Sequence, residues 1–161
     1  MLAIVWHSRT GAARAMADAA HAAAIKAAGD TARLIRAAAV EPDDLLAASG
    51  YLFICPENLG TMTGEMKEMF DRCYYPLLDR VAGRPYATAI TAGSDGHGAQ
   101  AQLDRIVTGW RLRRVAGPLI VNLKAQTPEA ILAPKAVPAA ALAACADLGA
   151  GLAAGLAQGI Y

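Results

Sequence analysis

Three short stretches of the chain combine hydroxyl groups, amides and glycines in a way that suits binding of a phosphate group and a flat ring. The first, called here the first loop, is His7-Ser8-Arg9-Thr10-Gly11-Ala12-Ala13. Ser8 and Thr10 offer hydroxyl donors, and Gly11 lets the backbone approach a ligand closely. The free N–H groups of the helix predicted to follow would attract an anion. An ordinary strand-to-helix turn capped by Ser and Thr is the alternative interpretation.

The second loop, residues 56–64, has the sequence Pro-Glu-Asn-Leu-Gly-Thr-Met-Thr-Gly. A flat heteroaromatic ring needs N–H and amide groups along one edge and apolar contacts on its faces. Asn58 and the permissive backbone at Gly60 suit the edge, and Leu59 and Met62 suit the faces. The alternative is a turn in which proline and glycine only set the geometry.

The third loop, residues 91–98, contains three glycines within six residues. It predicts tight turns or a ligand lying against the main chain. Its glycines do not follow the G-x-G-x-x-G order of dinucleotide sites, and the chain has no G-x-x-x-x-G-K-[ST] phosphate loop. The residue two positions before Ser94 is not glycine, which excludes the nucleophile elbow of a serine hydrolase. A mobile glycine loop is the alternative.

The elements that would position these loops alternate along the chain. Apolar runs predict strands and periodic segments predict helices; the strands are expected at 2–6, 31–35, 51–55, 86–91 and 119–123, and the helices at 12–28, 43–48, 63–75, 99–110 and 138–157. This order is typical of an α/β fold with a doubly wound parallel sheet. Ligands of such sheets bind beyond the carboxyl ends of the strands, where the three loops lie.

Details of this prediction concern particular residues. Pro56 is expected to stop the third strand, and Thr63 to cap the helix that follows. The segment Lys124–Ala136, with two prolines, is predicted to be a long surface excursion and is called the excursion below.

Length, charge and cysteine content exclude several classes of protein. A chain of 161 residues is the size of one domain. The formal net charge of +1 argues against a nucleic-acid surface, which needs clustered Lys and Arg. The three cysteines form no close pair, which excludes a disulfide framework and a C-x-x-C site and favours a reducing compartment, the cytoplasm.

The segment Val137–Tyr161 is apolar and carries Gly151, Gly155 and Gly159 at four-residue spacing. That stripe resembles the small-residue faces of packed membrane helices. Asp147 and the high alanine content favour instead a terminal helix that packs closely on a sheet, without membrane insertion. The stripe is also compatible with a homo-oligomer. No basic stretch precedes the apolar N-terminal run, so no signal peptide is expected.

The three loops together resemble the flavodoxin-like family. Residues 1–11 are similar to its opening strand and Thr/Ser-x-Thr-Gly phosphate loop. Residues 56–72 are similar to the second flavin loop and following helix of its NAD(P)H-dependent FMN reductases, and residues 93–98 to the third flavin loop. The resemblance extends to Leu123. It implies one flavodoxin-like domain over residues 1–161, with three layers and a five-stranded parallel sheet in the order 2-1-3-4-5.

The resemblance also implies which residues contact FMN. The residues expected to hold the phosphate are Ser8, Arg9, Thr10, Gly11 and Ala13. Those expected to line the isoalloxazine ring and the ribityl chain are Pro56, Glu57, Asn58, Leu59, Gly60 and Thr61. Those expected to close the opposite side are Ala92, Gly93, Ser94 and Gly96. The family often has Asn and then Thr or Ser after the first-loop glycine, whereas Ala12 and Ala13 stand here. Arg9 or Arg14 could compensate for the lost contacts.

The activity implied by the resemblance is FMN-dependent oxidoreduction, with NAD(P)H as co-substrate and a quinone or other small molecule as electron acceptor. The flavin carries out the hydride chemistry, so no catalytic side chain and no metal are expected. His7 and His97 could approach the site from two loops. One alternative is a flavodoxin-type electron carrier without turnover, disfavoured by the net charge because such carriers are strongly acidic. Another is a degenerate flavin-binding module, suggested by Ala12 and Ala13.

Overall fold

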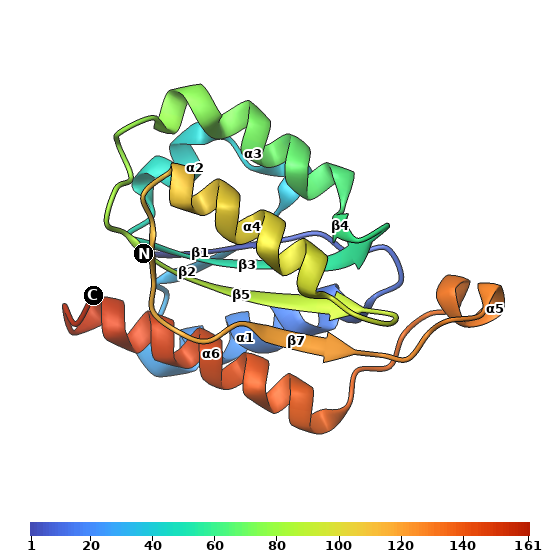
Figure 1. Cartoon of the computed structure of the whole chain (residues 1–161). Helices are drawn as coiled ribbons and strands as arrows, with labels where there is room; N and C mark the ends of the chain where they lie inside the picture. Colours follow the sequence, from blue (N-terminus) through green and yellow to red (C-terminus); the bar gives the residue numbers. More distant parts are fainter.

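A parallel β-sheet forms the middle layer of the molecule. The computed structural model describes all 161 residues and shows the strands side by side in the order β2-β1-β3-β5-β7 (Figure 1). Their bounds are β1 Leu2–Trp6, β2 Ala32–Arg36, β3 Gly50–Asn58, β5 Pro85–Ala92 and β7 Leu119–Asn122. Counted along these principal strands, the predicted order 2-1-3-4-5 is confirmed.

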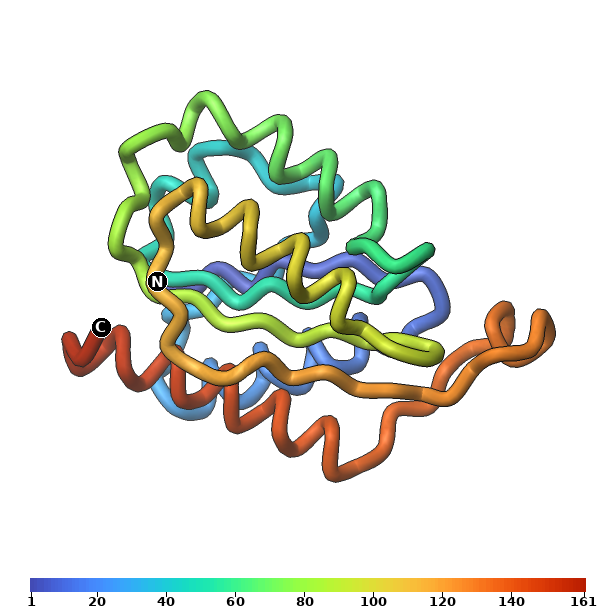
Figure 2. Tube along the Cα trace, in the orientation of Figure 1, coloured from blue at the N-terminus to red at the C-terminus, as the bar shows by residue number.

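Helices cover both faces of this sheet (Figure 1). α1 (Ala12–Ala28) and α6 (Ala139–Ala157) lie on one face. α2 (Pro42–Ala47), α3 (Gly64–Leu77) and α4 (His97–Gly109) lie on the other, with a 3₁₀ turn at Ala37–Ala39. Figure 2 shows the chain leaving β7, running out beyond the sheet to α5 (Pro128–Leu132) and returning to the start of α6.

The core consists of two apolar clusters, one on each face of the sheet. Alternate residues of a strand enter different clusters: Ile4 packs toward α1 and α6, whereas Val5 packs toward the face that α3 and α4 cover. Leu52 and Phe53 of β3 divide in the same way. Both faces are covered, which explains why the strands are continuous apolar runs rather than alternating ones.

The prediction that Pro56 stops the third strand is wrong. β3 continues through Pro56, which is in register with Thr91 of β5, and ends at Asn58. A proline is tolerated there because β1 has already ended at Trp6, leaving Pro56 a neighbouring strand on one side only. Beyond it the chain turns back as β4 (Thr61–Met62), which pairs antiparallel with the end of β3 and was not predicted.

The far edge of the sheet is interrupted. β6 (Arg113–Arg114) pairs with the start of β5, and β7 pairs with its end. Gly117-Pro118 breaks the edge between them, because proline cannot donate to the ladder. The excursion contains the short helix α5, which was also not predicted. The other element ends differ from the sequence-based ranges by a few residues at most.

α6 is the one helix long and apolar enough to span a membrane by length and composition, with a mean hydropathy of 1.6. It packs against α1 and the sheet, as the sequence predicts, through residues such as Cys145 and Leu152. The contact is close at Gly149, where an added Cβ would lie 2.2 Å from the carbonyl oxygen of Ala20. At Gly151, on the same helix, a Cβ would meet nothing within 4 Å.

This pair of glycines gives a matched test of the α1–α6 contact. Gly149→Ala is expected to lower the free energy of unfolding by about 1–3 kcal/mol, because the backbones must separate. Gly151→Ala is expected to raise it by up to about 1 kcal/mol, because alanine is the better helix former. Chemical denaturation of both variants measures the difference, and equal stabilities would contradict the packing described here.

Candidate functional site

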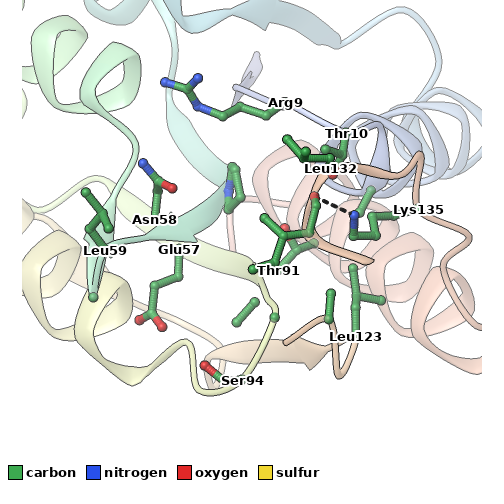
Figure 3. A pocket seen from close by; sticks show the side chains of 17 residues that line it. Arg9, Thr10, Glu57, Asn58, Leu59, Thr91, Ser94, Leu123, Leu132 and Lys135 are labelled. Carbon is green, nitrogen blue, oxygen red and sulfur yellow. Dashed lines mark hydrogen bonds between the residues drawn. The ribbon is translucent and has the colours of Figure 1, made fainter. Parts of the chain in front are cut away.

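A cavity of about 790 Å³ opens at the carboxyl ends of β1, β3 and β5, where the three loops meet (Figure 3). The sequence-predicted residues that line it are Arg9, Thr10, Pro56, Glu57, Asn58, Leu59, Gly60, Ala92, Gly93 and Ser94. They come from all three loops. The topology therefore gathers at one edge of the sheet segments that are far apart in the chain.

Five of the predicted residues do not line the cavity. In the first loop, the hydroxyl oxygen of Ser8 accepts a hydrogen bond from the Gly11 N–H at 3.1 Å, so Ser8 closes the loop on itself. Ala13 is 1% exposed and packs into the core. The Thr61 hydroxyl donates to the carbonyl of Asn58 at 3.2 Å and closes the hairpin. Gly96 starts α4. These five residues, the fifth being Gly11, shape the loops and helix starts or pack into the core rather than face the cavity.

The start of α1 leaves backbone donors free at the cavity. Gly11 precedes the helix with φ +96°, and no side chain caps the first turn. The first N–H group of the helix that has a backbone acceptor is that of Ala15, which donates to the Gly11 carbonyl at 2.9 Å. The first turn carries no acidic residue, and Ala12 lines the cavity. Amide groups and the positive end of a helix dipole are chemically suited to an anion.

Two other helices begin at the same edge, and each has an acidic residue at its start. α3 carries Glu65 there. α4 receives the carboxylate of Glu57, whose Oε1 accepts from the Gly96 N–H at 2.8 Å and whose Oε2 accepts from the Ala99 N–H at 2.9 Å. Of these three helix starts, α1 is the one without a carboxylate in or bonded to its first turn, which makes it the most favourable to an anionic ligand.

Glu57 was expected to line the ring and ribityl chain, and its carboxylate has protein partners of its own. The residue lines the cavity, but its carboxylate is engaged by α4. The second loop is thereby tied to the end of the third. A further close contact supports this junction: a Cβ at Gly98 would lie 2.1 Å from the carbonyl oxygen of Gly60.

The second loop projects a strained, exposed leucine at the cavity. Leu59 and Gly60 form the two-residue turn between β3 and β4, with φ values of +53° and +73°. Glycine adopts this left-handed conformation readily, whereas leucine does so at a cost of about 1–2 kcal/mol. The Leu59 side chain is 95% exposed and lines the cavity. The turn therefore holds an apolar side chain out at the cavity instead of burying it.

The excursion forms a wall of the cavity that sequence reasoning missed. The lining residues not predicted are Ala12, Thr91, Leu123, Ala125, Ile131, Leu132 and Lys135. The Lys135 N–H donates to the Thr10 carbonyl at 2.8 Å, which joins the excursion to the first loop. A Cβ at Gly93 would lie 2.6 Å from the Ala125 carbonyl oxygen, so the third loop is also packed against it. The only feature of the sequence that could have indicated this wall is the apolar pair Ile131-Leu132 between Pro128 and Pro134.

The two histidines that could approach the site, His7 and His97, are not among the residues that line the cavity. His7 is buried, with Nδ1 2.8 Å from the Thr63 hydroxyl and Nε2 3.0 Å from the Glu65 carboxylate. Thr63 was expected to cap α3, but its side chain makes no cap bond and faces His7 instead. His97 is exposed and pairs with Asp95 at 2.6 Å. No cluster of three or more His, Cys, Asp or Glu suits a metal ion.

Comparison with known proteins identifies the family. A family model described as NADPH-dependent FMN reductase matches residues 36–125, which include the second and third loops. The chain belongs to this family. A search of curated proteins finds no match.

Solved structures similar to this FMN reductase family member are flavodoxin-like. A flavodoxin from the domain Archaea superposes with a TM-score of 0.78 at 19% identity, covering 98% of this chain and 99% of that one. A flavodoxin from Megasphaera elsdenii gives 0.70 at 22% identity, covering 95% and 98%. A WrbA-like flavodoxin from Agrobacterium tumefaciens gives 0.70 at 19% identity, covering 98% and 97%. At these identities the likeness establishes the fold, which is flavodoxin-like as the sequence resemblance implied.

Burial of His7 predicts a loss of stability in acid. Burial is the largest influence and lowers the pKa of His7 below the ordinary 6.5, although the Glu65 carboxylate opposes this. The unfolded chain therefore takes up the proton first as the pH falls. The contribution of His7 to stability is complete above about pH 6.5 and is lost progressively below it.

The measurement compares denaturant midpoints of the native protein and His7→Gln at about pH 7.5 and about pH 5.5. The native protein is expected to lose more stability between these pH values than the variant. Identical losses would show that His7 does not titrate differently in the folded and unfolded states.

Proposed function

We propose that the cavity binds FMN and that the protein is an NAD(P)H-dependent FMN oxidoreductase that reduces a quinone or another small acceptor. The observation that carries this proposal is the open start of α1 at one end of the cavity, with the strained hairpin and the third loop at the other. Membership of the NADPH-dependent FMN reductase family supports the cofactor and favours NADPH as the co-substrate.

The phosphate end of the cavity fits an anionic group. The uncapped N–H groups at the start of α1 and the hydroxyl of Thr10 supply donors. The Gly11 conformation, with nothing within 4 Å of an added Cβ, leaves the approach clear. The cavity volume of about 790 Å³ lies within the range of about 300–1,000 Å³ typical of cofactor sites.

The ring end of the cavity fits a flat, partly apolar group. Asn58 offers an amide, and Leu59 offers an apolar face held out by the turn (Figure 3). Ile131 and Leu132 of the excursion are 52% and 78% exposed, and both line the same cavity. Covering these side chains with a bound ring or acceptor would remove apolar surface from water.

The residues of the chain act on such a ligand by binding and shielding it. FMN, when bound, supplies the hydride and electron-transfer chemistry. Glu57 keeps the second loop fixed against α4, so the ring edge meets a rigid backbone. The leucine and isoleucine side chains at the rim exclude water from the ring. The three buried, free cysteines suit a reducing compartment, which supports a cytoplasmic location as part of this proposal.

A flavodoxin-type electron carrier is the second candidate. It is favoured by superposition over nearly the whole length of single-domain flavodoxins. The formal net charge of +1 weighs against it, because a carrier docks on its partners through a strong opposite charge.

Purified protein with added FMN distinguishes these functions. The reductase is expected to show the visible absorption of a bound flavin. When a quinone is present it should oxidise NADPH to NADP⁺, and the quinone should gain two electrons and two protons, one proton from NADPH and one from solvent, to form the hydroquinone. Flavin absorption with electron exchange only through a protein reductase would indicate the carrier. Protein that remains colourless and does not bind FMN would contradict both.

Thr10 tests the phosphate end. Thr10→Val is expected to weaken FMN binding by about 3–10-fold, because one hydrogen bond to the phosphate is lost. Binding of riboflavin, which lacks the phosphate, should be unaffected. Thr108→Val is the matched control, since the Thr108 hydroxyl donates to Asp104 within α4, away from the cavity. Fluorescence titration measures both affinities, and an unchanged FMN affinity in Thr10→Val would contradict the assignment.

Leu59 tests the ring end. Leu59→Asn is expected to raise the free energy of unfolding by up to about 1 kcal/mol, because asparagine adopts the left-handed conformation more easily. It should also weaken flavin binding severalfold by removing an apolar contact. Arg111, with φ +56° outside the cavity, provides a control: Arg111→Asn should leave flavin affinity unchanged. A Leu59→Asn variant that binds flavin normally would show that the leucine has no contact with the ring.

A further inference from the structure

One cation from the excursion, a segment remote in sequence from the first loop, lies at the phosphate end of the cavity. Lys135 belongs to the excursion and lines the cavity, and its backbone N–H donates to the carbonyl of Thr10 at 2.8 Å. This bond connects residues that are remote in sequence. It fixes the backbone of Lys135 beside the loop that precedes α1, and Figure 3 shows Lys135 and Thr10 on the same side of the cavity.

The first loop has little polar side-chain chemistry of its own. Ala12 and Ala13 begin the helix and carry no side-chain donor, which leaves backbone N–H groups and the Thr10 hydroxyl. The two nearby arginines do not fill this gap. Arg14 forms an ion pair with Asp18 at 2.8 Å and lies over the ring of Trp6, 5.0 Å from its centroid. Arg9 lines the cavity, but in Figure 3 its side chain extends away from Thr10.

We propose that Lys135 is the cationic ligand of the phosphate group in this site. The inference rests on the proposed binding of FMN and extends it to a residue that neither the sequence pattern nor the family match includes, since that match ends at residue 125. The excursion then places one positive charge near the start of α1. The phosphate would be bound jointly by this charge, the first-turn N–H groups of α1 and the Thr10 hydroxyl.

The ammonium group of Lys135 has the capacity for this role. Its Nζ donates to the carbonyl oxygens of Ile131 and Ala133, at the end of α5. An ammonium group has three donors, so one remains for a phosphate oxygen. No carboxylate pairs with Lys135, and the one carboxylate among the lining residues, that of Glu57, is held by α4. The charge is therefore not cancelled within the protein.

A purely structural lysine would do something different. If Lys135 only closes the end of α5, its removal would loosen the whole wall that carries Ile131 and Leu132. Binding of any flavin would then weaken, with or without a phosphate. A lysine that binds the phosphate affects only the phosphorylated flavin, because riboflavin shares the ring but has no anion.

The experiment measures dissociation constants for FMN and for riboflavin by fluorescence titration of the native protein, Lys135→Met and Lys124→Met. Lys135→Met is expected to weaken FMN binding by about ten-fold, the effect of losing one charge-assisted hydrogen bond at a partly exposed site. Its affinity for riboflavin should match that of the native protein. Lys124→Met removes the same charge from an exposed position of the excursion and should leave both affinities unchanged.

Two further measurements sharpen the result. Lys135→Arg should retain most of the FMN affinity, because the charge remains. Added salt should weaken FMN binding by the native protein more than by Lys135→Met, since a screened charge has been removed from the variant.

Parallel losses of FMN and riboflavin affinity in Lys135→Met, or no loss of either, would overturn the assignment of Lys135 while FMN binding by the native protein stands. A native protein that binds neither flavin would overturn the proposed function itself, and this inference with it.

Discussion

The carboxylate of Glu57 at the start of α4 is the interaction on which the site depends. It accepts two backbone N–H groups and neutralises the positive end of that helix. The same contact joins the end of β3 to the loop after β5, so two walls of the cavity form one unit. Because it occupies α4, and Glu65 lies in the first turn of α3, the uncapped start of α1 is left to attract an anion.

Close backbone contacts at glycines complete this arrangement. Gly98 lets the carbonyl of Gly60 approach α4, and Gly93 lets the carbonyl of Ala125 approach the third loop. A side chain at either position would push apart segments that must meet to enclose a ligand. The glycines of the third loop therefore act through packing between loops as much as through freedom of the backbone. Gly149 plays the same part on the opposite face of the sheet, where α6 meets α1.

The site is also where the chain departs from local preference. Leu59 occupies a left-handed turn position that glycine or asparagine would fill more cheaply, and it remains exposed there. The first turn of α1 lacks the side-chain cap that would stabilise an isolated helix. Both departures lower the stability of the protein without a ligand. Both would favour binding of a ligand with an anionic end and an apolar face. Such local conflicts are expected where function competes with stability.

The sequence by itself determined the alternation of strands and helices, the bounds of α1 and the three loops, because these depend on local periodicity and on residues such as Gly11 whose conformational role is local. Only the tertiary structure decided the contacts that join the loops to one another and to the excursion. Whether β3 continues past Pro56 depends on which strands flank it, and the capping of α4 by Glu57 depends on a contact between remote segments. The excursion has no periodic pattern, yet a backbone bond to Thr10 brings Lys135 to the cavity. Sequence patterns report the neighbours along one element, whereas contacts between loops follow from where the sheet places their ends.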